Sequence, residues 1–200
     1  MTQIRFEGLR WSALSALARS PVDVSPVPLS LAQACHDRLM EHPNVERVIA
    51  AAAAAGLSIR VERFPAGTRT AADAALAVGC DVAQIVKSLV FMADGVPLVA
   101  LLSGAVRLDV ERLRAVVGAS AVRRASGDEA RRATGFAIGG VPPLGHAGPL
   151  DVLMDRRLLD HPVVWAAAGL PDAVFAVAPV DLRRAAGARL ADLAESTDPT

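Results

Sequence analysis

The chain has 200 residues, of which 52% are hydrophobic and 21% are charged, a composition typical of a globular domain with a real core and not of a disordered chain. Its 21 basic residues balance 21 acidic ones, so it has no overall positive charge with which to attract a polyanion. Any contact with nucleic acid must therefore be local.

Cysteine use and hydropathy predict a cytoplasmic protein. Cys35 and Cys80 are far apart and form no CxxC pair, which indicates free thiols and a reducing compartment. The first twenty residues are interrupted by Arg5, Glu7 and Arg10, unlike a secretory signal. No later stretch is apolar enough to span a bilayer, so we expect no membrane partner.

Residues 1–41 are predicted to be an N-terminal extension because the segment SPVDVSPVPLS carries three prolines. Two roles are open for this extension, which are to cover a face of the domain or to mediate self-association into a homodimer. The compact domain is expected to cover residues 42–197. Its first helix is predicted to begin at Pro43 and to end at Gly56.

The remaining elements of the domain alternate between the two kinds of secondary structure. The sequence predicts strands over 57–64, on both sides of a turn at 93–95, and over 121–125, 151–154, 174–177 and near Leu190. It predicts helices over 71–78 (capped by Thr70), 108–117, 128–134, 156–168 and 179–186, and one further turn capped by Asp81. The fold class is therefore α+β, a mixed sheet or partly open barrel flanked by helices.

Lys87 is the single lysine among the 21 basic residues, and it lies at the start of an apolar strand. Lysine is rarely buried unless it is paired or functional, and such an amine can stabilise an oxyanion, act as a base or form a Schiff base. A strand-end lysine that reaches water, in a sequence with a genomic bias toward arginine, is the alternative. Val86 precedes Lys87 where a Walker A motif needs glycine, which excludes a P-loop.

A second feature is the loop from Gly139 to Pro143, which contains Gly139, Gly140, Val141, Pro142 and Pro143. Paired glycines let backbone amides approach a ligand, and two prolines stiffen the chain, although an ordinary exposed turn has similar residues.

Two polar residues flank this loop in the sequence, and each has two interpretations. His146 either contacts substrate or makes one loop hydrogen bond. Asp155 either orients a substrate amine or caps the following helix. The histidines do not have the spacing of metal ligands, so we predict no metal.

Together, the segments TRTAADAALAVGCDVAQIVKSLVF, LLSGAVRLD, RRATGFAIGGVPPLGH and VLMD resemble the YbaK/ProX family of aminoacyl-tRNA deacylases over about residues 42–195. The resemblance implies hydrolysis of the ester of a mischarged tRNA, typically tRNA for proline carrying cysteine or alanine, without cofactor or metal. Prolyl-tRNA synthetase is the implied protein partner. Lys87 would be the catalytic lysine. The matching loop, Gly139, Gly140, Val141, Pro142 and Pro143, would shape the pocket for the aminoacyl group and the terminal adenosine. Apart from the resemblance, we predict substrate contacts from Thr70, Ser103, His146 and Asp155.

Two other hypotheses stay open from the sequence. One is a non-catalytic module that binds a tRNA end, a nucleotide or a protein partner. The other is Schiff-base chemistry at Lys87. The editing hypothesis requires the Lys87 amine and the Gly139–Pro143 loop to face one cavity.

Overall fold

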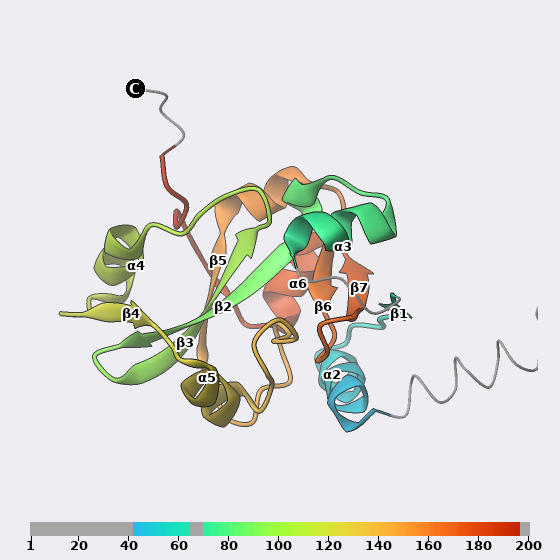
Figure 1. The fold of residues 1–200 in the computed structure, drawn as a ribbon, viewed down its shortest axis with the longest axis horizontal. Coiled ribbons are helices and arrows are strands. Elements are labelled where there is room, and N and C mark those ends of the chain that lie inside the picture. The colour runs from blue at the N-terminus through green and yellow to red at the C-terminus, as the bar shows by residue number, and fades with distance from the viewer. Residues whose placement is uncertain (1–41, 65–69, 197–200) are drawn as a thin grey trace, which may run out of the picture.

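The computed structural model describes residues 42–64 and 70–196, which form two β-sheets flanked by helices (Figure 1). Three predicted features lie outside the described residues: the extension over 1–41 with its boundary to the domain, the turn that follows the strand predicted over 57–64, and residue 197. The described chain confirms the α+β class, and its two sheets do not close into a barrel. No helix in the described ranges is both long and apolar enough to cross a membrane.

The larger sheet has the strand order β4-β2-β3-β5-β8. The strands β2 (Val86–Ala93) and β3 (Val96–Ser103) form an antiparallel hairpin, as predicted. The strand β4 (Val122–Arg124) pairs with the end of β2, while β5 (Asp151–Asp155) and β8 (Arg189–Ala191) continue the sheet in parallel beyond β3. The sheet is therefore mixed.

The smaller sheet is antiparallel and has the order β1-β7-β6. Its strands are β1 (Val61–Arg63), β7 (Ala173–Val177) and β6 (Val164–Ala167). The predicted strand over 57–64 is shorter than expected because only residues 61–63 have a pairing partner, on β7. Leu57 and Ile59 pack against the core without joining the sheet.

The helices begin and end near the predicted residues because their capping residues are encoded locally. They are α2 (Pro43–Ala54), α3 (Ala71–Val78), the single turn η1 (Val82–Gln84), α4 (Val110–Val117), α5 (Gly127–Thr134) and α6 (Pro179–Ala185). Thr70 and Asp81 form capping boxes with the residues three positions later, as expected for helix N-termini. Gly79 and Gly118 end α3 and α4 in the left-handed conformation.

The predicted helix over 156–168 is wrong. The structure has a short 3₁₀ helix η2 (Arg156–Asp160), followed by β6. The apolar residues of this stretch match a helical period, but Pro162 interrupts the helix, and the β-branched Val163 and Val164 favour extended backbone. The pairing of β6 with β7 then decides the structure.

Strand β2 separates two apolar clusters because successive side chains of a strand point to opposite faces. Val86 and Val90 belong to the cluster that includes α2, the smaller sheet and the loop before β5. Leu89 and Phe91 belong to the cluster on the other face, together with Leu113 of α4. The alternation along β2 therefore decides which side of the sheet each functional side chain reaches.

Candidate functional site

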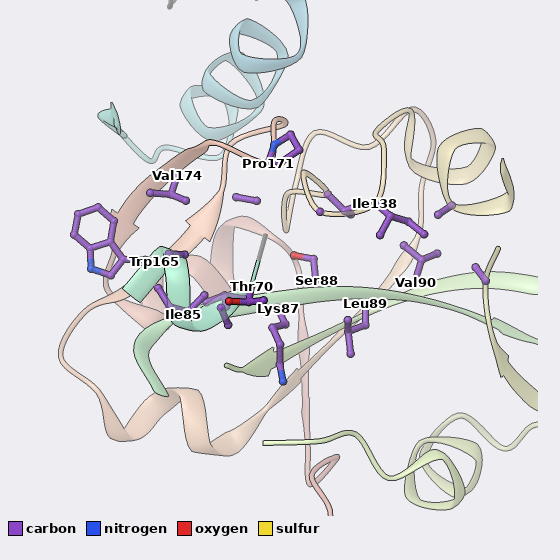
Figure 2. A pocket seen from close by; sticks show the side chains of 18 of the residues that line it. Thr70, Ile85, Lys87, Ser88, Leu89, Val90, Ile138, Trp165, Pro171 and Val174 are labelled. Carbon is purple, nitrogen blue, oxygen red and sulfur yellow. The ribbon is translucent and has the colours of Figure 1, made fainter. Parts of the chain in front are cut away.

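A cavity of about 470 Å³ lies between β2, the N-terminal end of α3, the loop that follows α5, and the smaller sheet (Figure 2). Its walls are mainly apolar, and its polar side chains are few. The lining includes Thr70, Lys87, Ser88, Gly139, Val141 and Trp165. A concave, largely apolar site with a few polar groups is typical of small-ligand binding.

The cavity lies against a part of β2 that no strand covers in the described chain. A bridge joins Ile85 to Trp165 at one end, and the Ala125 amide donates to the Val90 carbonyl at the other, 3.0 Å away. Between these points the edge of β2 is open at Ser88. Backbone groups alternate along a strand, so the Ser88 amide and carbonyl point to the same open edge as the Val90 carbonyl.

Ser88 is a functional candidate that the sequence analysis missed. Its hydroxyl is buried and has no hydrogen-bond partner among the described residues. Figure 2 shows the side chain on the side of β2 that faces Pro171 and Ile138. Buried polar groups are almost always paired, so an unpaired hydroxyl at a cavity wall is available to a ligand. Its position next to Lys87 was the one sequence signal that could have identified it.

Lys87 also lines the cavity, but its ammonium group points away from it, so the expectation that the Lys87 amine and the Gly139–Pro143 loop face one cavity is wrong for the amine. Figure 2 shows the Lys87 and Ser88 side chains leaving β2 in opposite directions. Lys87 Nζ donates to the carbonyl of Gly104 at 3.3 Å and, at closer range, to that of Val106. Desolvation lowers the pKa of Lys87 most, and the positive charges of Arg107 and Arg124 lower it further. The amine is therefore held by the loop after β3.

The predicted glycine loop does reach the cavity through Gly139 and Val141. Gly139 has a φ of 91°, which favours glycine. Position 140 requires glycine because the backbone of Leu170 lies close to it. An added Cβ would lie 2.8 Å from the carbonyl carbon of Leu170. Leu170 belongs to the turn between β6 and β7, so this turn packs against the loop where the loop forms the cavity wall.

Other predicted loop residues stabilise the wall from behind and do not line the cavity. Pro142 and Pro143 are buried in the core. His146 Nε2 lies 2.9 Å from the Pro142 carbonyl, so this nitrogen must carry the proton that it donates. Burial is the largest effect on His146 and lowers its pKa. The loop hydrogen bond that the sequence analysis offered as one interpretation of His146 is present.

Three predicted substrate contacts have structural partners in the described chain. Thr70 lines the cavity and also caps α3. Ser103 donates to the Ala83 carbonyl at 2.8 Å and accepts from the Ala105 amide. Asp155 is 1% exposed and caps η2, and it also accepts from the amides of Leu193 and Ala194. Ser103 and Asp155 are not among the lining residues.

Positive charge near the cavity comes from Arg124, which lines it and is exposed. Its neighbour Arg123 forms a two-point ion pair with Glu129 at 2.7 and 2.8 Å. The described ranges contain no group of three or more His, Cys, Asp or Glu side chains able to hold a metal ion.

Comparisons with known proteins converge on one family. The family model of the aminoacyl-tRNA editing domain matches residues 65–185. The proline–tRNA ligase of Maridesulfovibrio salexigens is 32% identical over 95 residues, which are 48% of this chain and 15% of that protein. The uncharacterized protein YwhH of Bacillus subtilis is 30% identical over 123 residues, which are 61% of this chain and 78% of that protein.

The fold has solved counterparts. One structure, described as that of a proposed trans-editing enzyme for prolyl tRNA synthetase, is 46% identical with a TM-score of 0.74, and the match covers 78% of this chain and 99% of that one.

The fold and the cavity define a small α+β domain with a ligand pocket at an open sheet edge. The chain belongs to the aminoacyl-tRNA editing domain family. It is related to the editing domains associated with prolyl-tRNA synthetase. The matched segment spans only about 15% of the length of the proline–tRNA ligase from Maridesulfovibrio salexigens.

Proposed function

We propose that this protein hydrolyses the ester that joins a wrong amino acid to the terminal ribose of tRNA, with tRNA for proline carrying alanine or cysteine as its substrates. The observation that carries the proposal is the cavity in which the Gly139–Val141 loop and the Lys87–Ser88 segment meet, in a chain of the editing family.

The walls of the cavity support a small aminoacyl group. Val86, Val90, Ala125, Ala130 and Val141 contribute apolar surface, and none of the lining residues in the described ranges carries a carboxylate. A methyl side chain (alanine) or a CH₂SH side chain (cysteine) can be buried there with a favourable transfer free energy of about 0.8 kcal/mol per CH₂ equivalent.

Hydrolysis at this site needs water, the ester and hydrogen-bond donors. The water oxygen bonds to the ester carbonyl carbon and gives up a proton, the bond from that carbon to the ribose oxygen breaks, and the ribose oxygen takes a proton. The backbone amides of Gly139 and Val141 and the Ser88 hydroxyl are suited to orient the carbonyl and to stabilise its developing negative charge. The Gly140 amide already donates to the Ala137 carbonyl at 3.1 Å. An aminoacyl ester is already activated, so positioning and charge stabilisation can supply the catalysis.

Lys87 contributes directly only if its amine exchanges the Gly104 and Val106 carbonyls for the substrate. Lys87 lies near the start of β2, and its side chain has four rotatable bonds. We propose Lys87 as the catalytic lysine on the condition that its amine leaves these two carbonyls when the substrate binds. A lysine that keeps its two carbonyl partners would act as a positioning residue through the loop after β3.

The test is a deacylation panel with alanyl- and cysteinyl-tRNA for proline and correctly charged prolyl-tRNA. We compare the wild type with Lys87→Ala and Ser88→Ala, after circular dichroism has shown that each variant is folded. The proposal expects hydrolysis of at least one mischarged tRNA, with prolyl-tRNA spared. A wild type that hydrolyses none of them would overturn it. Loss of activity in Lys87→Ala with retention in Lys87→Arg would favour charge at this position over a specific amine.

Prolyl-tRNA synthetase is the partner that we propose from the kinship with its editing domains. The chain is electrically neutral overall, so tRNA affinity from long-range attraction is small. A synthetase that holds the tRNA body would supply the missing affinity. A rise in the deacylation rate on addition of the synthetase at low tRNA concentration would support this partnership.

A further inference from the structure

Among the described residues that line the cavity, Trp165 is the one aromatic side chain. It lies on β6, and Figure 2 shows its indole at the end of the cavity beside Ile85 and Val174. The side chain is partly exposed, whereas its strand neighbours Val164 and Ala166 are fully buried in the core.

The residues around the indole leave room for a flat ligand. Ala176 lies opposite Trp165 in the pairing of β6 with β7, and Ala167 lies two positions further on the same face of β6. Both are alanines, whose side chains do not extend over a neighbouring ring. A large apolar residue at either place would have covered the indole and made it an ordinary packing residue.

The position of Trp165 relative to Ser88 suits one nucleoside. Trp165 is bridged to Ile85, and Ser88 lies three residues along β2 from that point, so the two side chains leave their strands on opposite faces and a ligand reaches both across the open edge of β2 along which the cavity lies. At about 3.3 Å per residue the separation along the strand is roughly 10 Å. A terminal nucleoside carries its base at one end and its ester-bearing ribose at the other, so both ends can be held within this span.

We propose that Trp165 is the stacking platform for the terminal adenine of the tRNA, and that this contact places the ester beside Ser88 and the Gly139–Val141 loop. The inference rests on the proposed function and identifies how that site holds its substrate. Base stacking on aromatic side chains is the usual way in which proteins bind single-stranded RNA ends. It suits a neutral chain because it needs no long-range electrostatic attraction.

The experiment uses the full-length chain carrying Trp11→Phe, because Trp11 and Trp165 are its two tryptophans. Adenosine 5′-monophosphate should quench Trp165 fluorescence in a saturable manner, whereas ribose 5-phosphate, which lacks the base, should not. Replacement of Trp165 by leucine should weaken binding of an uncharged RNA minihelix ending in CCA by roughly 5- to 150-fold. Trp165→Phe should retain most of the affinity, since it keeps an aromatic face.

The inference is overturned if the nucleotide and the ribose phosphate have equal effects, or if Trp165→Leu binds the minihelix as the wild type does. The minihelix carries no ester, so this readout is independent of hydrolysis. A chain that binds through Trp165 but deacylates nothing would refute the proposed function alone. A chain that deacylates with no dependence of minihelix binding on Trp165 would refute the stacking role alone.

Discussion

Lys87 and Ser88 are consecutive residues of β2, yet their side chains lie on opposite faces of the sheet (Figure 2). The Lys87 ammonium binds the carbonyls of Gly104 and Val106, whereas the Ser88 hydroxyl is buried without a partner at the cavity wall. The period of two in a β-strand imposes this separation. The polar group closest to a bound ester is therefore expected to be Ser88, unless the lysine side chain moves.

Replacement of Ser88 by alanine should lower the deacylation rate by about tenfold, the effect of losing one uncharged hydrogen bond to the substrate. Stability should be unchanged or slightly higher, because the lost hydroxyl has no partner in the folded chain. Ser103→Ala is the matched control. Its hydroxyl has two backbone partners, so the loss should cost about 1–3 kcal/mol in the free energy of unfolding. Denaturant unfolding measures the free energy of unfolding of both variants, and the deacylation assay measures their activity. A Ser88→Ala protein with full activity would contradict the assigned role.

The titration of Lys87 can be followed without interference because the chain has one lysine. Lysine labelled with carbon-13 at Cε should give a single titrating resonance, with a pKa below that of an ordinary lysine because burial and two nearby arginines disfavour the charge. Arg124→Gln removes one of these positive charges and should raise the pKa. Arg112→Gln, at a residue paired with Asp109, should leave it unchanged. Equal pKa values in the wild type and Arg124→Gln would refute this electrostatic account.

Gly140→Ala should destabilise the loop, because an added Cβ would lie within 3.0 Å of three backbone atoms of Leu170. Overpacking of this kind costs about 1–3 kcal/mol, and the displaced loop should reduce deacylation as well. Gly148→Ala is the control, since nothing lies within 4 Å of its added Cβ. Thermal melts and the deacylation assay compare the two. Equal stabilities for the two variants would show that the approach to Leu170 is not tight in solution.

Acid should destabilise the protein partly through His146. Burial lowers the folded-state pKa of this residue, and the positive charge of Arg47 lowers it further, while the hydrogen bond to Pro142 opposes the shift. The unfolded chain therefore binds the proton more readily, and stability falls as the pH drops through the ordinary histidine range toward the folded-state pKa. His146→Gln removes the titration, so the loss of melting temperature between pH 7.5 and 5.5 should be smaller than in the wild type. An identical pH dependence would exclude His146 as a contributor.

Local sequence signals predicted the elements whose ends are encoded by nearby residues. Thr70 with Asp73 begins α3, Gly79 ends it, and the turn at 93–95 joins β2 and β3 as expected. The prediction failed over 156–168, where an apolar period fits a helix but pairing with β7 makes a strand. Hydrophobic periodicity alone cannot distinguish a helix from a strand here, because the strand depends on pairing with β7, which the local sequence does not show.

Chemically unusual residue types directed attention to two segments that the fold brings to one cavity. The single lysine and the glycine-proline loop both line or support one cavity, because the residues flanking them encode a strand and a tight turn. The direction of the Lys87 amine, the unpaired Ser88 hydroxyl and the exposed face of Trp165 depend on which elements pack on each side of β2. Those contacts join residues up to about eighty positions apart, and burial and pairing at such distances are decided only when the chain folds.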